Sequence, residues 1–253
     1  MTILVTGGTG TLGSLVVRRL LDDGKPVRIL SRHERREGGV PGAEWAVGDL
    51  KTGAGLAAAF AGADTVIHCA TSPLGGDDKA AAQVVDAMRA AGAAHLVHIS
   101  IVGIERIPYS YYRTKLAVEG LLLESGVPVT VLRATQFHEF IVRMIGGLAK
   151  SPVVPVDRTI PCQPIAAAEV AEVLCELSYD KPAGRVPDLA GPEILAMPDF
   201  SRDFLRAAGK RRLLLPFRFP GAFFAGYRAG GHLAPERAVG RQTFAEFLQQ
   251  RYP

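Results

Sequence analysis

The residues Ile3-Leu-Val-Thr-Gly-Gly-Thr-Gly-Thr-Leu-Gly13 open the chain with an apolar run, a glycine-rich turn and the start of an amphipathic segment. Gly8, Gly10 and Gly13 have the spacing G-x-G-x-x-G between a predicted strand and a predicted helix. Gly10 would let backbone amides approach a pyrophosphate, and Gly13 would let the helix pack close to the sheet. The alternative is a glycine-rich turn that binds no ligand. The pattern favours a dinucleotide site, with predicted contacts from Gly7, Gly8, Thr9, Gly10, Thr11, Leu12 and Gly13.

Outward from this turn, short apolar runs alternate with helical patterns. The runs at 3–5, 27–30, 65–68, 96–99 and 129–132 predict buried strands, and the segments 12–21, 56–60, 79–91 and 114–125 predict helices between them. Repeated strand, crossover and strand units require a parallel sheet with helices on both faces. We therefore predict an α/β fold with a doubly wound parallel sheet.

The rhythm changes after about residue 150, where prolines interrupt the apolar runs. Helical patterns persist at 165–177, 197–208 and 244–250. This predicts two parts, a dinucleotide-binding domain over 1–150 and a smaller, substrate-facing cap region over 151–253.

The end of the second predicted strand bears on cofactor choice. An NAD-preferring site would offer a carboxylate to the ribose 2'-hydroxyl about twenty residues past the loop, but the chain has Ser31 and Arg32 there. Arg32, with Arg35 or Arg36, would pair with a 2'-phosphate through charge-assisted hydrogen bonds. The alternative is a solvated surface arginine near Glu34. We predict NADP(H) in preference to NAD(H).

A tyrosine and a lysine lie four residues apart in the run Tyr109-Ser-Tyr-Tyr-Arg-Thr-Lys115. Tyr111 and Lys115 fall on one face of a helix that starts nearby. Ser100 ends a predicted strand eleven residues before Tyr111. A phenol with a pKa near ~10 needs a neighbouring cation to exchange protons well at neutral pH, and Lys115 would supply it. A helix cap followed by core tyrosines is the alternative.

These motifs resemble the short-chain dehydrogenase/reductase superfamily, near its NmrA-like and sugar-epimerase-like branches, whose members have a Rossmann fold. The resemblance covers most of the chain, and it implies catalytic roles for Ser100, Tyr111 and Lys115, with Lys115 also touching the nicotinamide ribose. The segments that carry it include Gly7, Gly10, Gly13, Asp49-Leu50, Ala70-Thr71, Ser100, Tyr111, Lys115 and the run Leu132-Arg-Ala134-Thr135-Gln-Phe137 beside the nicotinamide.

Two features complicate the assignment. The sequence contains no asparagine, whereas many members of that superfamily use one in a proton relay beside the tyrosine and lysine. A relay here must use water, a backbone carbonyl or another side chain. Tyr109 and Tyr112 are alternative candidates for the catalytic phenol.

Asp49-Leu50 is placed to lie at the edge of the adenine ring. The alternative is that Asp49 is an ordinary turn aspartate.

The leading functional hypothesis is an NADPH-dependent oxidoreductase that acts on a carbonyl or alcohol of a small organic molecule. A non-catalytic NADP(H) sensor of NmrA type and an isomerase of the sugar-nucleotide epimerase type are the alternatives. Aromatic residues interleaved with arginines over 213–233 suggest an apolar or aromatic substrate under a lid, against the alternatives of a packed cap or a dimer surface. His138 and Glu139 would line the pocket or cap a helix.

The composition of the chain argues against several other classes of protein. With 253 residues, 48% of them hydrophobic, the chain can bury a substantial core. Its net charge of +4 is dispersed, which argues against a nucleic-acid partner. Three cysteines (Cys69, Cys162 and Cys175) predict neither a disulfide framework nor a metal site. Without a basic leader or an apolar run of ~20 residues, we expect no membrane span and a cytoplasmic protein. The oligomeric state stays open.

Overall fold

A computed structural model of the chain describes residues 1–34, 40–72 and 75–253. Within these residues, seven strands form one sheet in the order β3-β2-β1-β4-β5-β6-β9, and its paired strands run parallel. The strands are β1 (Ile3–Thr6), β2 (Val27–Ser31), β3 (Glu44–Val47), β4 (Thr65–His68), β5 (His95–Ile101), β6 (Val129–Ala134) and β9 (Gly184–Arg185). The strand order reverses beside β1, which confirms the predicted doubly wound α/β architecture.

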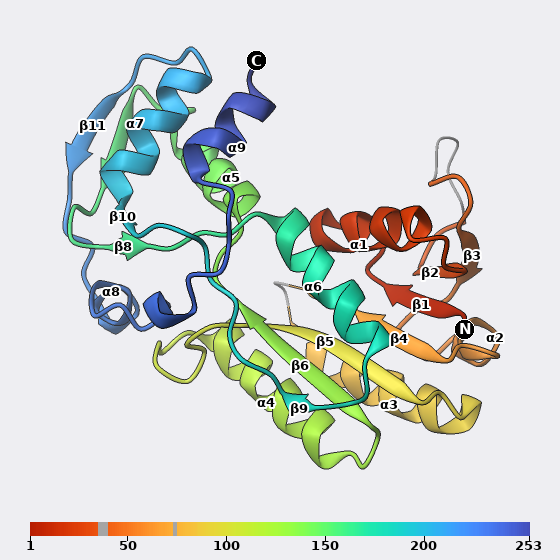
Figure 1. Cartoon of the computed structure of the whole chain (residues 1–253). Helices are drawn as coiled ribbons and strands as arrows, with labels where there is room; N and C mark the ends of the chain where they lie inside the picture. The colour runs from red at the N-terminus through yellow and green to blue at the C-terminus, as the bar shows by residue number, and fades with distance from the viewer. Residues whose placement is uncertain (35–39, 73–74) are drawn as a thin grey trace. The chain divides into compact units, whose positions relative to one another are not determined.

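Helices cover both faces of the sheet (Figure 1). They are α1 (Thr11–Asp22), α2 (Leu56–Phe60), α3 (Asp77–Ala91), α4 (Ser110–Glu124) and α6 (Ala167–Tyr179). The helices predicted over 12–21, 56–60, 79–91 and 114–125 correspond to α1, α2, α3 and α4. The helix α2 matches residue for residue, and the other three begin one to four residues earlier than predicted. Four of the glycines that follow them, at 24, 62, 92 and 126, have φ between +68° and +73°. These values are typical of glycines that end helices in the left-handed conformation.

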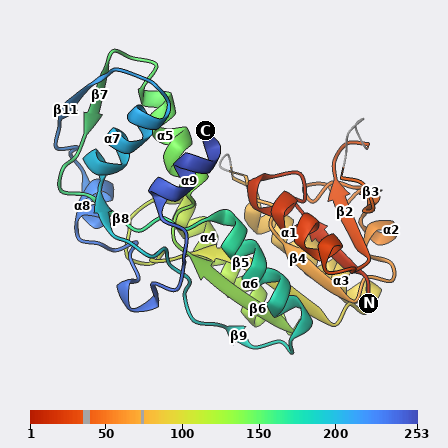
Figure 2. The same cartoon turned by 45° about the horizontal axis from the view of Figure 1, so that its top comes forward.

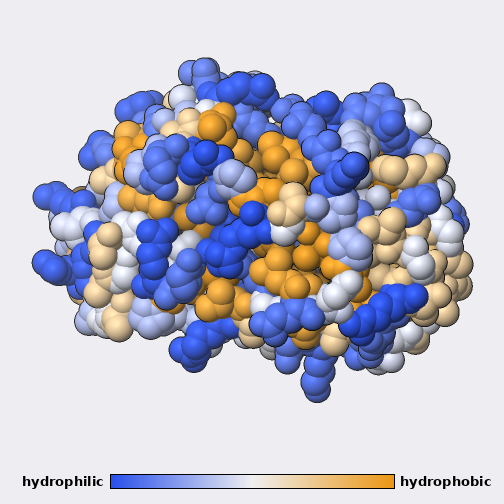
Figure 3. Space-filling view, turned by 60° about the horizontal axis from the view of Figure 1, so that its bottom comes forward, coloured by the Kyte–Doolittle hydropathy of each residue, from blue (hydrophilic) through white to orange (hydrophobic). Residues whose placement is uncertain are grey.

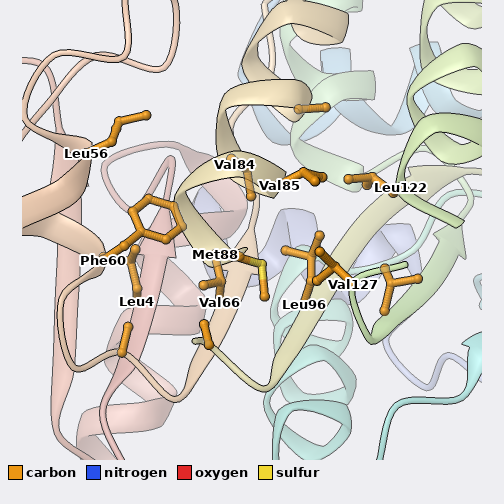
Figure 4. Close-up of a cluster of buried hydrophobic side chains, with 14 of the residues drawn as sticks. Leu4, Leu56, Phe60, Val66, Val84, Val85, Met88, Leu96, Leu122 and Val127 are labelled. Carbon is orange, nitrogen blue, oxygen red and sulfur yellow. The ribbon is translucent and has the colours of Figure 1, made fainter. Parts of the chain in front are cut away.

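A cluster of buried apolar side chains lies between the sheet and α2, α3 and α4 (Figure 4). Leu4 and Val66 contribute from neighbouring strands, and Phe60, Met88 and Leu122 come from the three helices. On β1 all four residues are buried, because the strand is covered on both faces. This accounts for the nearly continuous apolar runs that predicted the strands.

The opposite face of the sheet carries α1 and α6 (Figure 2). The two helices meet through the Tyr179 hydroxyl, which donates to an Asp23 carboxylate oxygen at 2.9 Å, and through an Arg19–Glu172 ion pair at 3.6 Å. Cys175 is buried against the Val16 carbonyl, and Cys69 and Cys162 are also free thiols. The helices α1 and α6 thus form one layer on this face of the sheet.

The chain divides into two compact units whose segments alternate along the sequence. The first comprises Met1–Ser100, Arg113–Leu132 and Val170–Val186, and the second comprises Ile101–Tyr112, Arg133–Glu169 and Pro187–Pro253. The functional division at residue 150 stays a prediction. None of the helices in the described ranges has the length and apolarity that a membrane crossing requires.

The second unit contains short elements packed around its own apolar core. The helices are α5 (His138–Leu148), α7 (Met197–Ala207), α8 (Ala222–Arg228), the 3-10 helix η1 (Pro235–Arg237) and α9 (Phe244–Arg251). The strands form two pairs, parallel β7 (Val153–Val156) with β11 (Leu213–Pro216) and antiparallel β8 (Pro161–Cys162) with β10 (Leu195–Ala196). Phe200, Phe204 and Phe244 are fully buried in its core.

The sequence analysis did not predict β3, α5, α8, η1 or the short strands β7 to β11. The strand β3 lies at the sheet edge and has no fully buried residue, although Trp45 to Val47 form a short apolar run. The helix α5 buries His138, Ile141, Val142 and Ile145, a spacing of three and four that is typical of one helix face. The pair Gly146-Gly147 lies inside this helix and lowers its intrinsic helix propensity.

Candidate functional site

The glycine loop joins β1 to α1 and requires glycine for steric reasons. Gly7 has a φ of +68°, and a Cβ there would lie 2.7 Å from the Ala70 amide nitrogen. A Cβ on Gly13 would overlap the Gly7 carbonyl oxygen. The loop is also tied by a hydrogen bond from the Gly10 amide to that carbonyl, at 2.9 Å. Hence the loop packs tightly against the segment after β4, in the geometry that the motif predicts.

Gly10 differs from its neighbours because the fold itself does not require it. Its φ is −82°, and a Cβ there would meet only the Gly7 carbonyl oxygen, at 3.3 Å. It caps α1, yet no side chain caps that helix and its first turn carries no acidic residue. The first-turn amides of a helix lack partners within the helix and attract anions. This cradle fits the diphosphate of a dinucleotide.

The turn after β2 holds Arg32 at the surface of the first unit. The Ser31 hydroxyl oxygen accepts the His33 amide at 3.2 Å, and the Trp45 indole donates to the His33 carbonyl at 2.8 Å. These contacts order the turn on both sides of Arg32, which is exposed and forms no ion pair with another described residue. Arg35 and Arg36 lie outside the described residues. A role for Arg32 in phosphate binding stays a prediction.

The other predicted dinucleotide contacts of the first unit lie in ordered turns. One Asp49 carboxylate oxygen accepts the Lys51 amide at 2.9 Å, as in an ordinary aspartate turn, and Leu50 is half-buried beside it. The Ala70 amide donates to the Thr6 hydroxyl oxygen at 3.4 Å. These contacts fix the backbone, and the adenine contact of Asp49 stays a prediction.

Buried polar side chains gather at the carboxyl ends of β1, β4 and β5. The rings of His68 and His98 stack with centroids 5.2 Å apart, and the Thr6 hydroxyl hydrogen-bonds His68 Nδ1 at 2.7 Å. Burial lowers the pKa of His68 to about 4 and that of His98 well below 6.5, and the Lys115 cation lowers both further. Both rings are therefore neutral at physiological pH. The sequence analysis did not assign either ring to this site.

Ser100 lies near the end of β5 with 3% of its surface exposed. Its hydroxyl oxygen and both ring nitrogens of His98 have no hydrogen-bond partner among the described residues. Buried polar groups without partners are uncommon in folded proteins and are costly to maintain. They are the groups that a bound polar molecule would satisfy, so this edge of the sheet fits a ligand.

Lys115 is a buried cation that acts electrostatically on His68 and His98 of the first unit. Only 4% of its surface is exposed, and its Nζ lies 3.5 Å from Asp77 Oδ2. Burial lowers the pKa of Lys115, and the Asp77 carboxylate opposes that shift. The carboxylate also accepts the Thr71 hydroxyl at 2.6 Å and the Ser72 amide at 2.7 Å. Asp77, which the sequence analysis missed, thus joins two predicted site residues, Thr71 and Lys115.

The three tyrosines of the second unit have different environments. Tyr112 is 4% exposed, and its hydroxyl lies 2.6 Å from that of Tyr227. Burial raises the pKa of Tyr112 and that of Tyr227, so both phenols stay protonated. Tyr109 is 40% exposed and packs against Phe223, with ring centroids 5.1 Å apart. Tyr111 is half-buried, and α4 contains it four residues before Lys115.

The predicted nicotinamide segment begins in the second unit at the end of β6. Ala134 and Thr135 are buried, and the Thr135 hydroxyl accepts the Gly191 amide at 3.4 Å. Phe137 is half-buried and caps α5. His138 is fully buried and hydrogen-bonds the Gln242 carbonyl at 3.0 Å, which makes it a packing residue of this unit. Cofactor contacts by Ala134, Thr135 and Phe137 stay predictions.

A hollow of about 600 Å³ opens on the second unit between α7 and β11. Its lining is strongly basic and consists of Arg202, Leu205, Arg206, Lys210, Arg211, Arg212, Leu213 and Leu214. None of these residues is a predicted catalytic or dinucleotide-binding residue, and the lining contains no carboxylate or hydroxyl. We therefore place the candidate chemistry at the polar cluster of the first unit. In the described part of the chain, no group of His, Cys, Asp and Glu is arranged to hold a metal ion.

Comparisons with known proteins agree with this geometry. The model of an NAD(P)H-binding family matches residues 7–181. The chain is 32% identical to a (4-alkanoyl-5-oxo-2,5-dihydrofuran-3-yl)methyl phosphate reductase of Streptomyces griseus subsp. griseus, over 86% of this chain and 76% of that protein. It spans about half the length of several other curated relatives.

Solved structures share the fold at low sequence identity. An NADPH-dependent quinone oxidoreductase from Escherichia coli, complexed with NADPH, superposes with a TM-score of 0.84 and 18% identity, covering 99% of this chain and 100% of that one. The triphenylmethane reductase of Citrobacter sp., complexed with NADP(H), gives a TM-score of 0.80 and 19% identity, covering 99% of each chain. The match of the family model over residues 7–181, together with the glycine loop and the parallel sheet, shows that the chain belongs to the NAD(P)H-binding family.

Proposed function

We propose that the protein is an NADPH-dependent reductase that converts a carbonyl group of a small organic substrate to an alcohol. When bound, the reduced dinucleotide supplies a hydride to the carbonyl carbon. The carbonyl π electron pair then moves to the oxygen, and the Tyr111 hydroxyl donates a proton there. Ser100 donates a hydrogen bond to the same oxygen, and the Lys115 cation favours the phenolate that Tyr111 leaves behind.

The burial of Lys115 carries this proposal. A lysine with 4% of its surface exposed costs free energy to keep charged, and it is seldom retained at such a position without a partner or a role. It follows Tyr111 by four residues on α4, so the two lie on one side of that helix. The unpartnered Ser100 hydroxyl in the same unit as Lys115 adds a donor for a substrate oxygen.

Selectivity for NADP(H) is part of the proposal. Arg32 is exposed in an ordered turn after β2, where an NAD-selective site would have a carboxylate. A guanidinium offers planar paired donors to a phosphate. The structural neighbours complexed with NADPH and NADP(H) support the proposal by analogy of fold.

The experiment that tests the acid is Tyr111→Phe. This change removes only the hydroxyl, so NADPH should still bind, whereas turnover should fall by a factor of about 100 to 10,000. Steady-state kinetics and fluorescence titration with NADPH measure the two effects. The matched control is Tyr112→Phe, whose hydroxyl is committed to Tyr227. It should lose some thermal stability and keep its turnover.

Other outcomes point to other functions. If Tyr111→Phe keeps full activity while Tyr112→Phe loses it, Tyr111 is not the acid. If the wild type binds NADPH but turns over no ketone, quinone or sugar nucleotide, the sensor function is favoured. Conversion of a sugar nucleotide without net consumption of the cofactor would instead indicate an epimerase. The chain contains no asparagine, and this observation favours the sensor as the second candidate function.

A further inference from the structure

Asp77 is the first residue of α3 and has only 5% of its surface exposed. Gly76, with a φ of +90°, caps the helix and supplies no side chain there. The Asp77 carboxylate accepts two hydrogen bonds from the segment after β4, one from the Thr71 hydroxyl and one from the Ser72 amide. A buried carboxylate is costly unless its oxygens are satisfied in this way.

The same carboxylate also contacts Lys115, whose Nζ lies 3.5 Å from Oδ2. Other titratable groups also face this lysine. His68 and His98 on β4 and β5 are neutral, and burial keeps Cys69 a thiol by raising its pKa to about 12. Glu119, one turn along α4, is paired with Arg185 at 3.0 Å. Asp77 is therefore the counter-ion of Lys115 among the described residues.

We propose that Asp77 is a positioning residue for Lys115, and that it fixes the ammonium group relative to the backbone at Thr71 and Ser72. The proposal rests on the function proposed above and names a residue that its chemistry requires. The chain has no asparagine, so a side chain of another type is one of the groups that could order the lysine. The Asp77 carboxylate can order the lysine directly, because it contacts both Lys115 and the segment after β4.

Helix capping is the competing explanation. Acidic residues in the first turn of a helix stabilise it through the helix dipole, wherever their side chains point. Asp78 provides the matched control, because it lies in the same turn of α3 but is exposed and makes no contact with Lys115. If capping explains Asp77, the variants Asp77→Asn and Asp78→Asn should behave alike.

A double-mutant cycle separates these explanations. The variants are Asp77→Asn, Lys115→Met, their combination and Asp78→Asn, each measured for NADPH affinity by fluorescence titration and for turnover. If Asp77 acts through Lys115, Asp77→Asn should lower turnover about ten- to a hundredfold and weaken NADPH binding in the wild-type background. In the Lys115→Met background it should change NADPH affinity by less than about twofold. Asp78→Asn should leave both quantities unchanged.

The pH dependence of turnover is a second measurement, and a residue that only caps a helix would not change it. Without the Asp77 carboxylate, burial lowers the pKa of Lys115 further, so the alkaline fall in activity should begin at lower pH than in the wild type. Because Asp77→Asn leaves a buried cation without its counter-ion and can prevent folding, Asp77→Glu is the second variant. It keeps the charge, and it should fold with lowered turnover and the wild-type alkaline limb.

The proposal is overturned if Asp77→Asn and Lys115→Met have multiplicative effects on NADPH affinity, or if Asp77→Asn leaves the pH profile unchanged. The affinity cycle needs no substrate. A wild type that turns over nothing would therefore defeat the proposed reduction, while leaving the coupling between Asp77 and Lys115 to be decided by the binding data alone.

Discussion

The Lys115–Asp77 pair is buried in the first unit and the Arg228–Asp157 pair in the second, and the two pairs have different surroundings. In the second unit, Asp157 accepts hydrogen bonds from Thr159, the Phe219 amide and Arg228, and Arg228 also donates to the Phe219 carbonyl. In the first unit, Lys115 has Asp77 as its single carboxylate partner among the described residues. Arg228 and Asp157 are both joined to the Phe219 backbone as well as to each other, which makes that pair part of the packing of the second unit.

The difference teaches how to separate structural from functional buried charge. The Asp157–Arg228 pair ties β7 to α8 and to the chain before it, so its removal should cost stability. The Lys115–Asp77 pair lies in the first unit with Ser100 and His98, whose polar atoms have no described partner. A network that joins side chains to the backbone rigidifies a fold, whereas the Ser100 hydroxyl and the His98 ring are groups that a bound ligand could satisfy. The face drawn in Figure 3 is mixed, with hydrophobic areas interrupted by hydrophilic side chains.

The largest expected effect concerns the glycine loop of the first unit, where we expect the cofactor to bind. Gly10→Val should abolish NADPH binding, because the branched side chain projects into the space in front of the loop. The fold should survive, since the φ of −82° suits any residue and a Cβ there would meet only one backbone oxygen. Calorimetric titration and circular dichroism measure the two outcomes.

Gly10→Ala is the graded control and should weaken binding less than Gly10→Val does. A folded Gly10→Val variant that binds NADPH as tightly as the wild type would remove the dinucleotide assignment of the loop, and with it the contrast between the two units.

The second prediction concerns the buried Asp157–Arg228 pair of the second unit. Asp157→Ala leaves Arg228 buried without its carboxylate and frees the Phe219 amide, so the free energy of unfolding should fall by about 3–5 kcal/mol. Denaturant unfolding measures this loss. NADPH affinity of the folded variant should be unchanged. A variant with wild-type stability and weakened cofactor binding would reverse the roles that we assign to the two pairs.

The smallest expected effect sharpens the cofactor assignment of the first unit. Arg32→Ala should weaken NADPH binding by about 1.5–3 kcal/mol, the cost of losing a charge-assisted hydrogen bond. NADH binding is the internal control and should not change, because NADH lacks the 2'-phosphate. Competitive titration with both cofactors measures the ratio. Equal losses for NADH and NADPH would place Arg32 outside the 2'-phosphate site.

The sequence alone predicted most of the first unit, and the reason is physical. A strand covered on both faces must be apolar along its whole length, and a dinucleotide loop must have glycine where a Cβ would strike backbone, as at Gly7 and Gly13. Both requirements are local, so they are visible in consecutive residues. The predicted strand at 65–68 and the helix at 56–60 accordingly match β4 and α2 residue for residue.

Only the tertiary structure decided which of the candidate groups are available. Tyr111 and Tyr112 are indistinguishable as neighbours in the sequence, but Tyr112 is committed to Tyr227, which lies 115 residues away. Asp77 reads as an ordinary helix-start acid until the fold brings Lys115 within 3.5 Å of it. Hydrogen-bond partners and burial depend on residues far apart in the chain, and no local pattern encodes them. The sequence therefore determined the scaffold and the loop, and the fold determined how the charges and phenols are paired.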